Sequence, residues 1–175
     1  MAEPVTLEQA KAHCRVLHDD EDNLINALII AAREWVEHFT GHILVKREIV
    51  QRLNWSAPRL FAWPIADDAE PSVSYLDSDG APQTLADARL IFGNSYAQIA
   101  PAFGANWPTA YGPVTVTVEA GYGSPEDVPQ SLKQAMLLLI GHYYVNRQAV
   151  SDKTTSEVPM AVEALCMPYR SVMIG

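Results

Sequence analysis

One long amphipathic segment constrains this chain more than any other feature, and the residue pattern changes directly after it. From Asp22 to about Thr40, apolar residues recur at steps of three and four, which predicts a helix with one apolar face. Gly41 supplies the stop signal, and the acids before the helix favour the positive end of its dipole. The apolar positions are Leu24, Ile25, Leu28, Ile29, Ala32, Trp35, Val36 and Phe39.

The residue pattern is different between Ile43 and Gly121, where Pro, Gly and Asp separate short runs of β-branched and aromatic residues. Such runs are typical of strands. The clearest run ends at Ala120, because its valines alternate with polar residues as in a half-buried strand. Asp77 to Gly80 predicts a turn. The predicted strands are Val45–Leu53, Leu60–Trp63, Ser72–Leu76, Ala88–Phe92, Gln98–Ala100 and Val114–Ala120.

Further helices are expected on both sides of this stretch. Thr6 and Gln9 have the spacing of a capping box, which predicts a short helix through about Cys14. Pro129 suits the first turn of a helix that runs to about Arg147. That helix is apolar around most of its circumference, so it must be covered on more than one side, by the domain itself or by a neighbouring subunit. A last short helix is expected over Met160–Met167.

Composition limits the class of protein. With 175 residues, 49% of them hydrophobic and 19% charged, the chain is expected to be one globular domain. The net charge of −9 argues against a protein that grips nucleic acid, although an acidic protein can lie beside DNA that slides past. Residues 135–145 are too few to cross a membrane. The first residues lack the pattern of a signal peptide, so we expect a cytosolic origin.

Candidate metal sites are weak. His38 and His42 are four residues apart, but Gly41 ends the helix between them, so surface or capping histidines are favoured over a zinc site. Cys14 and His18 are also four residues apart, and a zinc site is equally disfavoured for them.

Other candidate sites also favour a structural interpretation. One disulfide between Cys14 and Cys166 is arithmetically possible, but two buried reduced thiols are favoured. The acids from Asp19 to Asp22 are interpreted as a solvated helix cap in preference to a cation site. The turn that starts at Asp77 lacks the later ligands of a calcium loop. No catalytic residue, metal or cofactor is predicted.

Two segments carry a resemblance to a known family. The first contains Leu7–His13, the acids up to Asp22, Ala31–Glu37 and Thr40–Gly41; the second contains Ala120–Gly123, Asp127–Pro129, Leu132–Ala135, His142–Tyr143, Asn146–Arg147, Val158–Pro159, Val162–Leu165 and Pro168–Arg170. In this order and spacing they resemble the head–tail connector family of long-tailed bacteriophages and prophages, also called adaptor or head completion proteins. The resemblance covers nearly the whole chain, although the middle matches only in pattern.

The resemblance implies a fold and a set of partners. The expected fold class is α+β, mainly α, with about four helices in a core of residues 1–42 and 124–170 and a β-rich insertion over residues 43–121. The implied protein is a structural subunit of the virion neck, made in the host cytoplasm, that forms a ring of about a dozen copies. Implied partners are the portal protein, a tail-side stopper or terminator protein, and DNA that passes through the channel without sequence-specific binding; no membrane is involved.

Interface residues are expected among aromatic and arginine side chains, which concentrate binding energy. The two long helices are expected to leave apolar surface that sister copies cover. The candidates are Arg33, Trp35, Trp107, Tyr143, Tyr144, Arg147, Tyr169 and Arg170. Two other functions are weighed against this one: a small cytosolic hydrolase, which needs converging histidines and acids, and a nucleic-acid-binding regulator, which needs a basic stripe.

Overall fold

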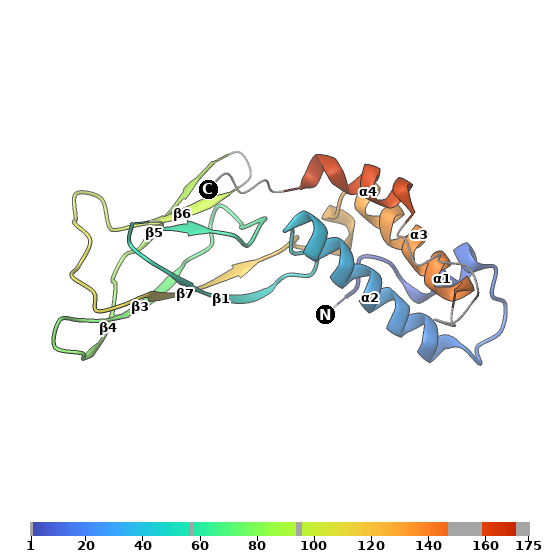
Figure 1. Ribbon diagram of the computed structural model, residues 1–175, viewed down its shortest axis with the longest axis horizontal. Coiled ribbons are helices and arrows are strands. Elements are labelled where there is room, and N and C mark those ends of the chain that lie inside the picture. Colours follow the sequence, from blue (N-terminus) through green and yellow to red (C-terminus); the bar gives the residue numbers. More distant parts are fainter. Residues whose placement is uncertain (1, 57, 94–95, 147–158, 171–175) are drawn as a thin grey trace. The chain divides into compact units, whose positions relative to one another are not determined.

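The computed structural model describes residues 2–56, 58–93, 96–146 and 159–170 (Figure 1). The chain divides into two compact units. The helical unit consists of Met1–Val45 together with Gly123–Gly175, and the β unit consists of Lys46–Tyr122. At the level of fold class the prediction is confirmed, because the described residues form four α-helices and two antiparallel sheets.

The helical unit is organised around one central helix. Its helices are α1 (Leu7–Cys14), α2 (Asp22–Thr40), α3 (Gln130–Val145) and α4 (Met160–Cys166), with single 3-10 turns at Pro125–Asp127 and Met167–Tyr169. Helix α3 packs against each of the other three. The completely covered side chains of its core include Ile25, Ala32, Val36, Leu132, Met136, Leu139, Ile140, Val162 and Cys166.

The predicted capping box at the start of α1 is confirmed. The Gln9 N–H donates to Thr6 Oγ1 at 3.2 Å, and the Thr6 N–H donates to Gln9 Oε1 at 3.0 Å. At the end of α2, Gly41 adopts the left-handed conformation with φ 77°, and its N–H donates to the Glu37 carbonyl at 2.8 Å. Helices α1 and α2 therefore begin and end where their sequence signals predicted.

The acidic run before α2 differs from its prediction. The N-cap residue of α2 is Glu21, which makes no side-chain capping bond. Asp19 and Asp22 instead accept hydrogen bonds from Lys11 Nζ, both at 2.6 Å. Asp19 is 89% exposed and so is solvated as predicted, whereas Asp22 is 31% exposed; the prediction missed that both carboxylates bind a lysine of α1.

The later helices agree with expectation except at their ends. Pro129 lies just before α3 as its N-cap residue, not inside the first turn. The predicted end at Arg147 lies outside the described residues. The last helix begins at Met160 as predicted, and the 3-10 turn after it carries the chain through Pro168.

The β unit contains two antiparallel sheets. The first has the order β1 (Arg47–Leu53), β7 (Val114–Ala120), β3 (Ser72–Leu76), β4 (Pro82–Thr84), and the second has the order β2 (Arg59–Leu60), β6 (Ala97–Ala100), β5 (Arg89–Phe92). The valines of β7 and Ala120 are buried, as their alternation predicted. Strands β3 and β7 have the predicted bounds.

Four strand predictions need correction, and one strand was missed. Strands β5 and β6 begin at Arg89 and Ala97, one residue from their predicted starts. Strand β1 begins at Arg47 instead of Val45. Strand β2 stops at Leu60 instead of Trp63, because the Phe61 N–H donates to Gln51 Oε1 at 3.0 Å and not to a neighbouring strand. Strand β4 was not predicted, and all three of its residues are exposed.

Candidate subunit interface

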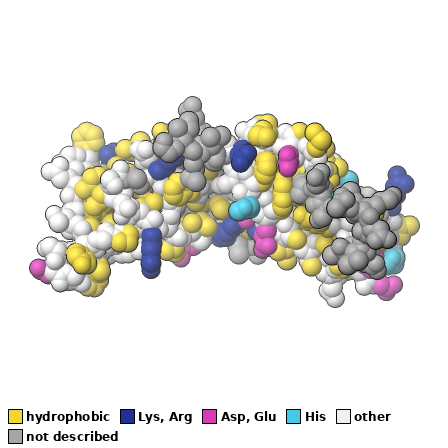
Figure 2. Space-filling model, viewed as in Figure 1, with side chains coloured by type: hydrophobic (Ala, Val, Ile, Leu, Met, Phe, Trp, Pro, Cys, Tyr) yellow, Lys and Arg dark blue, Asp and Glu magenta, His cyan; other side chains and the backbone are white. Residues whose placement is uncertain are grey.

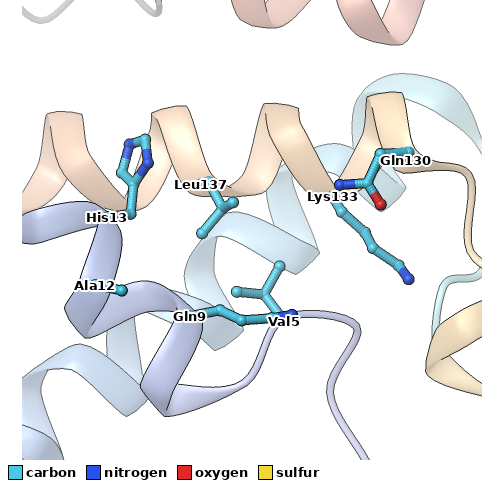
Figure 3. A pocket seen from close by; sticks show the side chains of 7 residues that line it. All are labelled: Val5, Gln9, Ala12, His13, Gln130, Lys133 and Leu137. Atoms are coloured by element: carbon cyan, nitrogen blue, oxygen red, sulfur yellow. The ribbon is translucent and has the colours of Figure 1, made fainter.

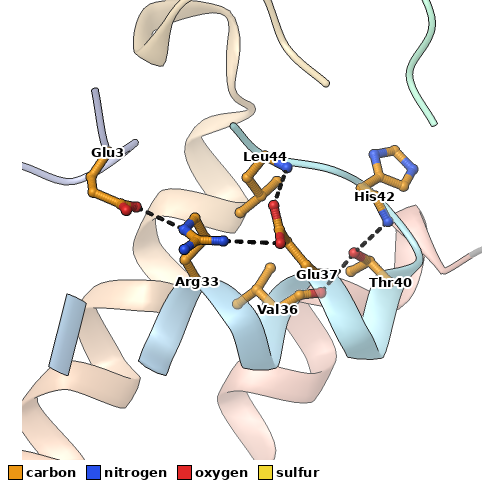
Figure 4. A network of polar contacts seen from close by, with 7 residues as sticks. All are labelled: Glu3, Arg33, Val36, Glu37, Thr40, His42 and Leu44. Carbon is orange, nitrogen blue, oxygen red and sulfur yellow. Dashed lines mark hydrogen bonds and ion pairs between the residues drawn. The ribbon is translucent and has the colours of Figure 1, made fainter. Parts of the chain in front are cut away.

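Arg33 is held inside the helical unit by a polar network (Figure 4). Its Nε donates to Glu3 Oε2 at 2.9 Å and its Nη1 donates to Glu37 Oε2 at 3.1 Å. The other oxygen of the buried Glu37 accepts the Leu44 N–H at 2.7 Å. Arg33 therefore joins the N-terminal segment to the segment that leaves α2.

The end of α2 closes in the same region. Thr40 Oγ1 donates to the Val36 carbonyl at 2.7 Å and accepts the His42 N–H at 3.1 Å (Figure 4). His42 is buried, and this burial lowers the pKa of its imidazole below the ordinary value. The Tyr169 ring lies edge-on to His42 with centroids 5.8 Å apart.

The aromatic candidates of α2 and α3 also have partners in the helical unit. Trp35 stacks on Phe39 with centroids 5.0 Å apart, and the Arg170 guanidinium carbon lies 5.2 Å from the Phe39 centroid. The Tyr144 hydroxyl donates to a carboxylate oxygen of Glu21, which ties the end of α3 to the start of α2.

The remaining candidates are Tyr143, Trp107 and Arg147. Tyr143 is half-buried, and burial raises the pKa of its hydroxyl. In the β unit, Trp107 stacks on Trp55 with centroids 4.4 Å apart, and the edge of Trp55 meets Tyr75. Arg147 lies outside the described residues. The role of the eight candidates at an interface stays a prediction.

The apolar side chains of the two long helices are covered more fully than the sequence suggested. The buried positions of α2 and α3 lie within the helical unit, and most of their other large apolar side chains are half-buried. The large apolar side chains classed as exposed on these two helices are Ile30 and Val145.

Helix α4 carries the apolar face that sequence reasoning missed. Met160 is 87% exposed and Met167 is 53% exposed, while Val162 and Cys166 on the opposite side are completely buried. Ala164 is also exposed and lies between the two methionines. Their spacing of four and three residues places all three on one face, so helical periodicity could have identified it. In Figure 2 the surface over α4 is largely hydrophobic.

The candidate metal and thiol positions do not combine into a site. His38 is exposed on α2, whereas His42 is buried after the end of this helix. Cys14 is half-buried and Cys166 is buried, and neither forms a disulfide. Burial raises the pKa of the Cys166 thiol to about 11. Within the described ranges, no three or more His, Cys, Asp or Glu side chains gather closely enough to hold a metal ion.

The length and apolar character of the helices bear on whether they could span a membrane. None of the helices formed by the described residues has the length and apolar character needed to span a membrane.

The exposed Asp77 carboxylate closes its predicted turn by accepting the N–H groups of Asp79 and Ala81 at 3.0 and 2.9 Å. Those bonds, with one from the Gln83 side chain as the largest effect, lower the pKa of the carboxyl.

Comparisons with known proteins agree on one structural class. Residues 4–70 match the model of the family described as "Phage gp6-like head-tail connector protein". The comparison with curated proteins returned no match.

Solved structures extend the likeness to the whole chain. A chain in "Neck of empty GTA particle computed with C6 symmetry" is 25% identical with a TM-score of 0.76, over 99% of this chain and 94% of that one. A chain in "Virion of native gene transfer agent (GTA) particle" is 24% identical with a TM-score of 0.77, over 98% and 91%. One in "Neck of native GTA particle computed with C12 symmetry" is 24% identical with a TM-score of 0.68, over 94% and 89%.

Proposed function

We infer that this chain belongs to the phage head–tail connector family and is a structural connector subunit of a virion neck. The observation that carries this function is the agreement between two kinds of likeness. The family match covers residues 4–70, and the likeness to a chain of a particle neck covers 99% of the chain. The function is mechanical, and we propose that the protein acts without catalysis.

We propose that the subunits form a ring of about a dozen copies between the portal and a tail-side stopper or terminator protein. Support comes from the neck structures, whose particles were computed with C6 and C12 symmetry. A cyclic ring closes only if each copy uses two different surfaces, one toward each neighbour. We propose that the helical and β units together make one such connector subunit.

We propose that DNA passes through the ring without sequence-specific binding. The chain has 21 acidic and 12 basic side chains, so its net charge repels phosphates. A channel that does not attract phosphate reduces sticking while DNA moves. The expected result is that the purified protein gives no gel shift of duplex DNA at low micromolar concentration and low salt, where nonspecific electrostatic binding is strongest.

The decisive experiment assembles the protein on its portal. The full chain and the portal protein encoded with it are co-expressed, purified as a complex, weighed by native mass spectrometry and imaged by electron microscopy. We expect a cyclic ring of this chain stacked on the portal. A portal that never recruits the chain, at any ratio of the two proteins, would refute the function.

A further inference from the structure

The exposed face of α4 is the starting observation. We call Met160 and Ala164 of α4, together with Met167 directly after it, the α4 ridge. Its two methionines are 87% and 53% exposed, although α4 packs firmly on α3 through Val162 and Cys166. Methionine is flexible and adapts to irregular apolar surfaces, so an exposed pair on one helical face suits a contact with another protein.

The second observation is a groove between α1 and α3. This α1–α3 groove encloses a cavity of about 360 Å³, with Val5, Ala12 and Leu137 among its apolar lining (Figure 3). Its polar lining includes Gln9, His13 and Lys133. The helices approach closely here, because a Cβ on Gly141 of α3 would lie only 3.3 Å from the His13 ring.

The charges of the lining residues distinguish this groove from a second groove in the helical unit. Glu163 is the acid on α4, is exposed beside the ridge, and makes no ion pair within the described part of the chain. Lys133 in the α1–α3 groove likewise makes no ion pair there. The other groove, of about 590 Å³, is lined by Glu3, whose charge is paired with Arg33, and by the exposed Glu126, which would repel Glu163.

The ridge and the groove also suit a ring, in which each copy uses two different surfaces to contact its two neighbours. Helix α4 and helix α1 both pack on α3, and the ridge lies on the side of α4 that faces away from α3. The ridge and the groove are thus different surfaces of one chain. A head-to-tail contact needs two such unlike surfaces that complement each other, whereas a two-fold contact uses one surface twice.

We propose that the α4 ridge of one copy packs into the α1–α3 groove of the next copy, with Glu163 opposite Lys133. This inference rests on the proposed function, since it names the contact that joins neighbours in the ring. The methionines supply the apolar burial, and the ion pair selects the groove and the direction of the contact.

Cysteine cross-linking on the assembled portal complex tests the contact. In a Cys14→Ser background, one variant carries Glu163→Cys and a second carries Lys133→Cys; native Cys166 is buried and stays in place. The mixed variants should form a covalent heterodimer, and neither variant alone should cross-link. A chain carrying both substitutions should give a ladder of oligomers. Self-cross-linking of either single variant, or no heterodimer from the mixture, would overturn the inference.

A charge exchange gives an independent readout. Glu163→Lys and Lys133→Glu should each weaken association between neighbours about five- to tenfold, because like charges then face each other. The double variant should recover wild-type assembly. Glu126→Lys is the matched control, since it reverses an exposed acid of the competing groove and should leave assembly unchanged. Disruption by Glu126→Lys, or no recovery in the double variant, would count against the ridge-in-groove contact.

The two failures are distinguishable. If the wild-type chain forms a ring on the portal but neither cross-links nor charge exchange report on α4, the contact is wrong and the connector function stands. If the wild-type chain is never recruited by the portal, the function itself fails, and the contact fails with it.

Discussion

At the residue scale, Glu37 is the side chain on which the helical unit should depend most. It is 9% exposed and binds both Arg33 and the Leu44 N–H. Glu37→Ala leaves the partly buried Arg33 with Glu3 as its remaining carboxylate partner and leaves the Leu44 N–H without its acceptor. We expect the free energy of unfolding to fall by about 2–3 kcal/mol, measured by urea denaturation.

Glu34→Ala is the control for that prediction. Glu34 lies on the same helix but is exposed, so its replacement should change the free energy of unfolding by no more than about 0.5 kcal/mol. Equal effects of the two substitutions would show that the Glu37 network contributes no specific stability.

The two cysteines should differ in reactivity. Burial raises the pKa of both thiols, and Cys166, with a pKa of about 11 and no exposed surface, is the more protected. Only the thiolate reacts, so iodoacetamide at pH 8 should modify Cys14 first and reach Cys166 only after unfolding. Mass spectrometry of the peptides measures both rates. Comparable rates in the folded protein would contradict the structure.

Residue type predicted interface candidates but did not predict their partners. Arg33, Trp35 and Tyr144 were chosen because such side chains often bind partners. Each instead has a contact inside the helical unit: Arg33 with Glu3 and Glu37, Trp35 with Phe39, and Tyr144 with Glu21. The pairs Arg33–Glu37 and Trp35–Phe39 are four residues apart on one helix, a spacing that the sequence does show. Glu3 lies 30 residues from Arg33 and Glu21 lies 123 residues from Tyr144, and no local pattern in one sequence indicates contacts over such separations.

At the scale of elements, predictability followed the strength of local signals. Helices α1 and α2 had a capping box and a glycine stop, and both were predicted with their observed bounds. Strand β7 was predicted equally well because its alternation is strict. Strand β4 has three exposed residues and a proline, so no hydrophobic pattern marks it. Pairing with β3, which depends on tertiary structure, makes it a strand.

The end of α2 offers a test at this scale. Gly41→Ala places a Cβ on a residue with φ 77°, where L residues are strained. We expect a loss of about 1 kcal/mol in the free energy of unfolding, and a fall in Tm of about 2–4 °C. Gly41→Asn is the control, because asparagine tolerates this conformation and should cost less. An alanine variant as stable as wild type would indicate that the turn relaxes.

At the scale of the whole molecule, the division into two units follows from strand pairing. Strands β1 and β7 are antiparallel neighbours, and Arg47 pairs with Ala120. The ends of the β unit therefore lie side by side, so the chain enters and leaves it at one place. The change in residue pattern at residues 43 and 121 predicted where the β-rich region begins and ends. The sequence did not indicate which strands pair with one another.

This pairing predicts that the helical unit can fold without the β unit. Paired Cα atoms in adjacent strands are about 5 Å apart, so a Gly-Ser linker of about four residues can replace Arg47–Ala120. The core side chains of α2, α3 and α4, among them Met136, all belong to the helical unit. We expect the shortened chain to show a helical circular dichroism spectrum and one cooperative thermal transition.

Met136→Ala distinguishes a native core from a loosely collapsed one. Met136 is completely buried, so its truncation should lower the free energy of unfolding by about 2–5 kcal/mol in both the full chain and the shortened chain. A shortened chain that unfolds without cooperativity, or that is insensitive to Met136→Ala, would mean that the helical core needs the β unit to form. A sensitive, cooperative transition would instead locate the stability of α2, α3 and α4 in the contacts among themselves, leaving the β unit free to vary in sequence without unfolding the helices.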